Sequence, residues 1–448
     1  MGLIELTEGG ARVFSPTTAA AVVIANMVGT GVFTSLGFQL ADIRSVFVLL
    51  LLWAVGGITA LCGALCYAEL GAALPRSGGE YNFLSRVLHP GVGFVGGWVS
   101  ATIGFAAPSA LAAITFGAYL SSVFPSLNES WLAGMLIVVL TALHCRSRRS
   151  SGTTQTLFTW LKIGLILGFC GLALALVETP QALTLTPAAG DVELMTGGAF
   201  AVSLIYVSYA YTGWNSATYL SGELANPQKQ LPRILAGGTL IVLVMYLLLN
   251  YTFLAVAPMD AMAGQVEVGY IAAQHAFGSG GAQIMGVLLS LLLISTVSAM
   301  TLAGPRVLQM MGEDFPVFGA LGRTNEQGVP RLAIITQAVL TLVFIVSASF
   351  KAILLFAGFT LAANTVAVVA SLFVLRIREP DLSRPFRVPL YPLPALVFLA
   401  VTLWTLYYVV KENPLQAGYG LLIFLGGGVV YVFVRTYEAR RYGADNPR

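Results

Sequence analysis

The chain has 448 residues, of which 57% are hydrophobic and only 10% are charged. An ordinary soluble domain carries roughly 25% charged residues. The composition therefore excludes a typical soluble protein and predicts a chain embedded in lipid. The near balance of 23 basic and 20 acidic residues also argues against nucleic-acid binding.

Twelve apolar stretches are candidates to cross the bilayer, whose hydrocarbon core of roughly 30 Å takes about 20 helical residues. Their approximate ranges are 17–40, 46–70, 92–124, 131–144, 155–177, 196–221, 234–257, 282–308, 332–349, 352–375, 394–411 and 415–434. We predict a single transmembrane domain over residues 1–448, with helices 1–6 in 17–221, helices 7–10 in 234–375 and helices 11–12 in 394–434.

Basic residues are unevenly divided between the two sets of loops that this helix count creates. Nineteen of the 23 fall on the side of the termini, three fall on the opposite side, and one, Lys162, lies within a span. Cytoplasmic loops of membrane proteins are enriched in Lys and Arg. We therefore predict a multi-pass protein of the cell (inner) membrane with both termini in the cytoplasm.

Polar, glycine-containing sequences interrupt the first and the sixth spans. The first span contains Gly29-Thr30-Gly31, and the sixth contains the segment from Tyr209 to Asn215. Close helix packing explains such glycines equally well when each span is considered alone. Two interruptions five helices apart, however, are typical of inverted-repeat transporters, whose binding site lies between broken helices.

A broken helix exposes amide donors at the start of one half and carbonyl acceptors at the end of the other. These groups suit the carboxylate and the ammonium of an α-amino acid. The predicted substrate-binding positions in the two interruptions are Met27, Gly29, Thr30, Gly31, Tyr209, Ala210, Thr212 and Gly213. No acidic side chain is expected at the breaks, which favours a neutral amino acid over a polyamine. A side chain added at Gly31 is expected to fill the carboxylate site.

Three charged residues near the spans are further candidates. A charge at the depth of Lys162 is costly enough to indicate function, as a proton-exchanging group or as a fixed cation in place of sodium. Snorkelling to the surface is the alternative for this residue. Glu69 and Glu223 end helices 2 and 6, and we interpret both as forming salt bridges at the inner mouth. The basic residues expected nearby are Arg76, Arg86, Lys229 and Arg233.

No catalytic feature accompanies these residues. The three histidines lack metal-ligand spacing, and there is no nucleophile motif or phosphate-binding loop. We predict that the protein is not an enzyme and uses no metal and no cofactor. Its predicted partners are a small-molecule substrate and the lipid bilayer.

Several motifs together resemble the amino acid–polyamine–organocation superfamily, most closely its amino acid permease and L-type exchanger branch. They are Gly29 to Phe33, Tyr67 to Leu70, Pro75 to Tyr81, Tyr209 to Asn215 and Arg384 to Pro389. The resemblance implies an all-α integral membrane protein with the LeuT-type five-plus-five inverted-repeat fold and 12 transmembrane helices.

The resemblance also implies roles for individual residues. The amides of Thr30 and Gly31 would hold the substrate carboxylate, and Tyr209 would form an aromatic lid. Asn215 would face the pocket, and Lys162 would replace a sodium site. The chain departs from the branch at Thr212, where many L-type members have glycine. The loop between helices 3 and 4 contains no cysteine, so no disulfide-linked heavy chain is expected.

The predicted function is sodium-independent secondary transport of neutral L-amino acids by alternating access, through exchange or proton coupling. Two alternatives stay open at this point. One is a polyamine or cationic amino acid transporter, and the other is an amino acid sensor or channel that uses the same broken helices without turnover.

Overall fold

The computed structural model describes residues 16–146 and 151–442, and within these ranges the chain forms helices and no β-strand. The elements are α1 (Pro16–Met27), α2 (Thr30–Gln39), α3 (Val46–Ala73), α4 (Glu80–Val87), α5 (Pro90–Val99), the π-helix η1 (Ser100–Gly104), α6 (Ala106–Val123), α7 (Glu129–His144), α8 (Ser151–Leu176), α9 (Asp191–Thr196), α10 (Gly198–Tyr211), the 3-10 helix η2 (Trp214–Glu223), α11 (Pro227–Val256), α12 (Met259–Met262), α13 (Val268–Ala303), α14 (Pro305–Asp314), the 3-10 helix η3 (Pro316–Phe318), α15 (Gly319–Gly322), α16 (Arg331–Ser347), α17 (Phe350–Arg378), α18 (Leu393–Glu412) and α19 (Pro414–Tyr442).

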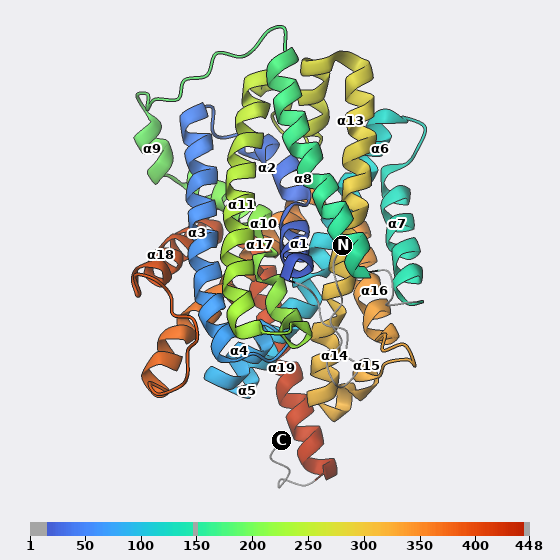
Figure 1. Ribbon diagram of the computed structural model, residues 1–448, viewed down its shortest axis with the longest axis vertical. Coiled ribbons are helices and arrows are strands. Elements are labelled where there is room, and N and C mark those ends of the chain that lie inside the picture. The colour runs from blue at the N-terminus through green and yellow to red at the C-terminus, as the bar shows by residue number, and fades with distance from the viewer. Residues whose placement is uncertain (1–15, 147–150, 443–448) are drawn as a thin grey trace.

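The long helices have the length and composition of membrane spans. Within the described residues, nine helical segments could cross a bilayer, and three shorter apolar helices, α7, α10 and α16, lie at further predicted spans. Figure 1 shows α3, α8, α11 and α13 running along the long axis of the molecule. This architecture confirms the all-α membrane fold, and the count of twelve transmembrane helices stays a prediction with which it is consistent.

The first and the sixth predicted spans are both broken. Helix α1 ends at Met27 and α2 begins at Thr30, whereas α10 ends at Tyr211 and η2 begins at Trp214. The breaks pack against each other at Gly213, whose φ of +110° lies in a region that side chains rarely adopt. A Cβ at this position would lie 2.8 Å from the backbone carbon of Asn26. Glycine therefore permits the two breaks to meet.

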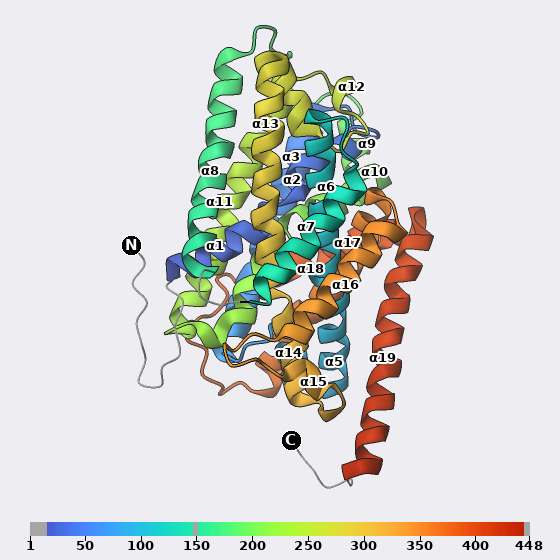
Figure 2. The ribbon, with the colours of Figure 1, turned by 90° about the vertical axis from the view of Figure 1, so that its right-hand side faces the viewer.

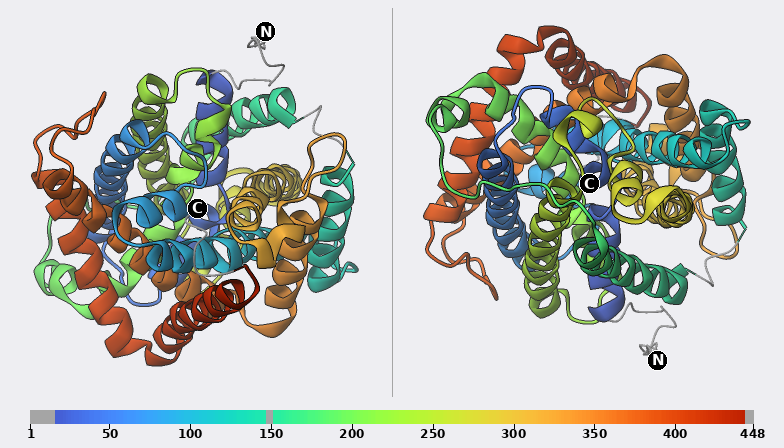
Figure 3. Two further views of the ribbon diagram at one scale, coloured as in Figure 1. Left: turned by 90° about the horizontal axis from the view of Figure 1, so that it is seen from below. Right: turned by 90° about the horizontal axis from the view of Figure 1, so that it is seen from above.

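Helices α18 and α19 lie at the periphery of the molecule, α18 at the left edge in Figure 1 and α19 at the right edge in Figure 2, and the end views in Figure 3 agree. Large apolar side chains project from α19 to the outside: Leu421, Leu422, Leu425, Val429, Val432 and Phe433. A bilayer would cover such a surface, which a soluble protein could not leave in water.

Ion pairs join segments that the distribution of basic residues assigns to the same side of the membrane. The pairs are Arg76–Asp314 at 2.7 Å, Arg86–Glu379 at 2.6 Å and Arg44–Asp260 at 2.7 Å. Figure 2 shows α14, which ends at Asp314, and α12, which contains Asp260, toward opposite ends of the molecule. The side assignment is thus consistent with the contacts. Four of the basic residues on which it rests lie outside the described residues: Arg12, Arg148, Arg149 and Arg448.

Candidate functional site

Two neighbouring cavities lie at the broken helices. The smaller, which we call the backbone cavity, has a volume of about 20 Å³ and is bordered by the ends of α1, α2 and α10. The larger, which we call the wide cavity, has a volume of about 80 Å³ and reaches η1, η2 and α17. Asn26, Tyr209, Thr212 and Met300 line both of them. A molecule bound at the breaks would therefore face the two cavities at once.

The predicted binding positions all lie at these cavities. The backbone cavity is lined by Met27, Gly29, Thr30, Gly31, Tyr209, Ala210 and Thr212. The wide cavity is lined by Tyr209, Thr212, Gly213 and Asn215. The structure thus brings together residues from two distant parts of the chain, and their role in binding stays a prediction.

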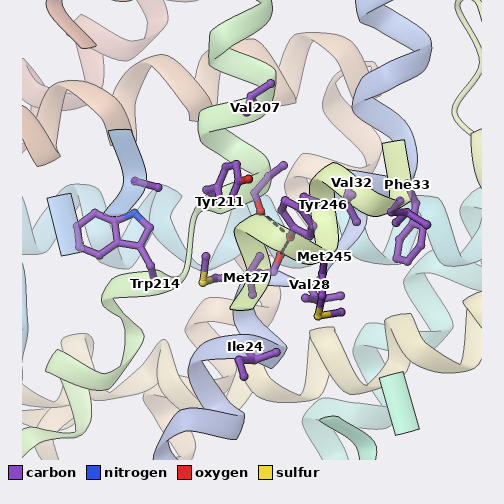
Figure 4. Packing of buried hydrophobic residues seen from close by; sticks show 14 of the residues in the cluster. Ile24, Met27, Val28, Val32, Phe33, Val207, Tyr211, Trp214, Met245 and Tyr246 are labelled. Atoms are coloured by element: carbon purple, nitrogen blue, oxygen red, sulfur yellow. Dashed lines mark hydrogen bonds between the residues drawn. The ribbon is translucent and has the colours of Figure 1, made fainter. Parts of the chain in front are cut away.

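Tyr246 of α11 connects the two breaks, and sequence reasoning missed it. Its hydroxyl lies 2.6 Å from the carbonyl oxygen of Met27 and 2.9 Å from that of Ala210. Figure 4 shows this side chain between the two broken helices. One proton can be donated to only one of the two carbonyls at a time. No sequence signal distinguishes Tyr246, because a tyrosine within an apolar span is usually a packing residue.

A side chain at Gly31 would have a different effect from the expected one, while the binding role of its backbone amide stays a prediction. A Cβ there would lie 2.4 Å from the Cα of Ala210. The expectation that an added side chain would fill the carboxylate site is therefore wrong, since the side chain would instead collide with α10. The absence of a side chain at Gly31 permits close approach of the two half-helices.

Lys162 of α8 is fully enclosed, with 1% of its surface exposed. Its Nζ donates to the carbonyl oxygen of Val28 at 2.7 Å and to Thr296 Oγ1 at 2.8 Å, and Ala25 O lies at 3.4 Å. These contacts exclude snorkelling as the explanation for its position. The ammonium lies at the carbonyl end of α1, where the helix dipole favours a positive charge.

Glu80 overturns the expectation that no acidic side chain lies at the breaks. The preceding Gly78 and Gly79 adopt positive φ angles of 110° and 52°. A Cβ at Gly79 would lie 2.7 Å from the ring of Tyr219 in η2. The glycine pair therefore lets α4 begin directly against η2. Glu80, only 3% exposed, consequently lines the wide cavity.

Four neutral groups donate hydrogen bonds to the Glu80 carboxylate. Oε1 accepts from the hydroxyl of Tyr67 at 2.6 Å and from Asn215 Nδ2 at 3.1 Å. Oε2 accepts from Ser100 Oγ at 3.0 Å and from Asn364 Nδ2. Burial raises the pKa of the Glu80 carboxyl above its ordinary value, while the four donors oppose that rise. An available signal for this residue was its place directly after two consecutive glycines.

Asn26 is a second cavity residue that sequence reasoning missed. It is 3% exposed, and neither its Nδ2 nor its Oδ1 has a hydrogen-bond partner among the described residues. The hydroxyl of Ser216, which lines the wide cavity, also has no partner there. Buried polar groups are normally paired, so unpaired groups beside a cavity indicate a missing ligand or water.

Glu69 forms a buried ion pair with a partner that was not expected. Its oxygens accept from Arg376 Nε at 2.8 Å and from Arg376 Nη2 at 2.6 Å, and the amide of Val388 donates at 2.7 Å. The interpretation of Glu69 as a salt-bridge residue agrees with this pair, although the partner comes from the end of α17 and is none of the basic residues expected nearby. Glu223 ends η2 as expected, but its side chain lies outside the described part of the chain.

Comparison with known proteins agrees with this architecture. A sequence model of the amino acid permease family matches residues 14–434. The chain is similar to the large neutral amino acids transporter small subunit 2 of Mus musculus, with 28% identity over 97% of this chain and 83% of the relative. It is equally similar to the serine/threonine exchanger SteT of Bacillus subtilis (strain 168), with 28% identity over 94% of this chain and 96% of the relative.

A further relative is the b(0,+)-type amino acid transporter 1 of Mus musculus, at 25% identity over 93% of this chain and 86% of the relative. These relatives are transporters, which confirms the predicted resemblance and the prediction that the chain is not an enzyme. The family match covers nearly the whole sequence, including both broken helices. The chain is a multi-pass membrane protein that belongs to the amino acid permease family.

Proposed function

We propose that this permease is a secondary transporter that moves neutral L-amino acids by exchange, through alternating access and without sodium. The observation that carries the proposal is the pair of broken helices that meet at two shared cavities. Backbone amides and carbonyls freed at such breaks match the two charges of an amino acid main chain.

A neutral substrate is favoured by the charges around the cavities. Glu80 is the acidic residue that lines the wide cavity, and its oxygens already accept four hydrogen bonds from neutral donors. A cationic side chain would have to displace one of these donors to reach the carboxylate. The names of two relatives also refer to neutral amino acids, namely large neutral amino acids and serine with threonine.

Sodium independence is supported by the position of Lys162. Its ammonium is within 3.4 Å of two backbone carbonyls and the hydroxyl of Thr296. Carbonyl and hydroxyl oxygens are also ligands of hard cations. We infer that the lysine fills the place in which a sodium ion would otherwise bind.

The membrane location, the orientation and the partners of the protein are part of the same proposal. The excess of Lys and Arg in the loops on the side of the termini favours a cell (inner) membrane location with both termini in the cytoplasm. The described cysteines, Cys62, Cys66, Cys145 and Cys170, are free thiols, and the loop between α6 and α7 contains none. A disulfide-linked heavy chain is therefore not part of the proposed assembly.

Counterflow into proteoliposomes that contain the purified protein tests the function. We expect uptake of labelled neutral amino acids to require internal unlabelled substrate and to be equal in sodium and choline buffers. Strict dependence on sodium would overturn the role given to Lys162. Binding without counterflow would identify a sensor, and stronger competition by putrescine or arginine than by alanine or leucine would identify a polyamine or cationic amino acid carrier.

A further inference from the structure

The wall of the wide cavity is polar and incompletely paired. Asn26 contributes an amide whose two polar atoms are both without a partner among the described residues, and Ser216 contributes an unpaired hydroxyl. Both side chains are at least nine-tenths buried, with exposures of 3% and 1%. A ligand that donates and accepts hydrogen bonds would satisfy these groups, whereas an apolar ligand would leave them unpaired.

Glu80 sets the direction of another amide in this wall. Asn215 donates its Nδ2 to Glu80 Oε1 at 3.1 Å. The amide oxygen of Asn215 is consequently the atom that it can offer to a ligand in the wide cavity that it lines. The other donors to Glu80 come from α3, η1 and α17. Together with Asn215 of η2, they let one carboxylate fix the relative positions of four elements around the cavity.

We infer that the wide cavity selects amino acids whose side chain bears a hydroxyl or a carboxamide, with Asn26 as a direct contact and Glu80 as the positioning residue that orients Asn215. This inference rests on the proposed transport of neutral amino acids and narrows it to a polar subset. The two cavities share Tyr209 and Thr212, so a main chain bound in the backbone cavity directs its side chain into the wide cavity.

Pairs of substrates with the same shape separate this inference from a preference for size. Threonine and valine differ by a hydroxyl in place of a methyl group, and asparagine and leucine have similar shapes. A site that hydrogen-bonds a substrate group rejects the analogue that lacks it far more strongly than an apolar site distinguishes two isosteres. We therefore expect threonine to compete for exchange at a concentration about tenfold or more below that of valine, by the same argument.

Two variants test the residues in proteoliposome counterflow. Asn26→Leu keeps the approximate size of the side chain and is expected to bring the threonine-to-valine preference close to one. Glu80→Gln replaces one carboxylate oxygen, the acceptor of two of the four donors, by an NH2 group. When this group takes the Oε1 position, Asn215 loses the acceptor that orients it, so we expect the KM for threonine to rise more than that for valine. Glu379→Gln is the matched control, because Glu379 pairs with Arg86 away from both cavities and should leave the preference unchanged.

The pH dependence of the threonine-to-valine preference distinguishes a positioning role of Glu80 from a purely structural one, which would not make the preference depend on pH. The titratable groups that face Glu80 are Tyr67 of α3 and Tyr219 of η2, while Ser100 of η1 and Asn364 of α17 do not titrate. Because burial raises the pKa of Glu80, the carboxyl gains its proton at a higher pH than an exposed glutamate does. The threonine preference should fall as the pH is lowered in the wild-type protein and stay constant in Glu80→Gln.

The outcomes separate this inference from the proposed function. Equal competition by threonine and valine in the wild-type protein would overturn the polar selection while neutral amino acid exchange still stood. A wild-type preference in Asn26→Leu would exclude Asn26 as a contact. This variant keeps the hydrogen bonds of Glu80, so it still tests the inference if Glu80→Gln fails to fold. An unchanged preference in Glu80→Gln would remove its positioning role. Absence of any amino acid exchange would instead contradict the proposed function.

Discussion

Replacement of Gly213 by alanine should separate the two broken helices. The φ of this residue is +110°, where an L-residue with a side chain is disfavoured. The new Cβ would lie 2.8 Å from the backbone carbon and 2.9 Å from the Cβ of Asn26. Because the first of these atoms belongs to the backbone, a change of side-chain rotamer cannot relieve the overlap.

The expected loss of stability combines two effects. A side chain in a left-handed conformation costs roughly 1–2 kcal/mol. Insertion of an extra carbon into a closely packed site typically costs about 1–3 kcal/mol. Gly213→Ala should therefore lower the free energy of unfolding by about 2–5 kcal/mol. The strain falls at the junction of the two cavities, so counterflow should be lost even in protein that is still folded.

Gly168 in α8 supplies the matched control, because a Cβ there meets no atom of the described residues within 4 Å. Alanine is preferred to glycine within a helix by roughly 0.5–1 kcal/mol, so Gly168→Ala should retain both stability and exchange. Thermal unfolding of the purified variants and counterflow in proteoliposomes measure the two quantities. Wild-type Tm and exchange in Gly213→Ala would refute the view that the breaks meet at this glycine.

Three further substitutions each remove a buried hydrogen bond or ion pair, and the lost contact predicts the effect on stability or exchange. Arg376→Ala leaves the Glu69 carboxylate with only the longer ion pair to Arg384, at 3.7 Å, and should cost about 3 kcal/mol. The measurement is a fall in Tm that the additional change Glu69→Gln largely restores, and an equal fall in the double variant would contradict this. Tyr246→Phe removes the hydroxyl between two buried carbonyls and should cost about 1–3 kcal/mol and slow counterflow, whereas wild-type exchange would show that the bridge is dispensable. Lys162→Met leaves the Val28 carbonyl with only a long hydrogen bond of 3.4 Å from Thr296 Oγ1 and should lower exchange in sodium-free buffer by about tenfold or more. Full activity there would exclude a role for the ammonium.

The architecture follows from local features of the sequence to a large extent. A membrane span is recognisable by its length and apolarity alone, so the ends of α3 and α17 lie within a few residues of the predicted ranges. The breaks were also predictable, because a glycine such as Gly213 between polar residues cannot be explained by lipid contact. Both signals depend on consecutive residues and need no knowledge of which helices are neighbours.

The lining of the cavities depends on tertiary contacts and was predicted less well. Glu80 belongs by sequence to a loop on the side of the termini, and only the approach of α4 to η2 turns it inward. Tyr246 and Asn26 lie in apolar spans, where the rotation of the helix decides whether a polar atom faces lipid, protein or a cavity. The partner of Glu69 was missed for a related reason, because Arg376 is more than 300 residues away in the sequence.

Lys162 and Glu80 are buried charges that contact different parts of the broken helices and impose different constraints. Lys162 contacts the carbonyl end of α1, so it bears on the half-helix whose backbone would recognise any amino acid. Glu80 contacts Asn215 in the wide cavity, where only the side chain of a substrate would reach. A change at Lys162 should therefore alter the transport of all substrates alike, whereas a change at Glu80 should alter the ratio between them. Separate contacts of this kind permit a permease to change its side-chain preference while it keeps its recognition of the amino acid main chain.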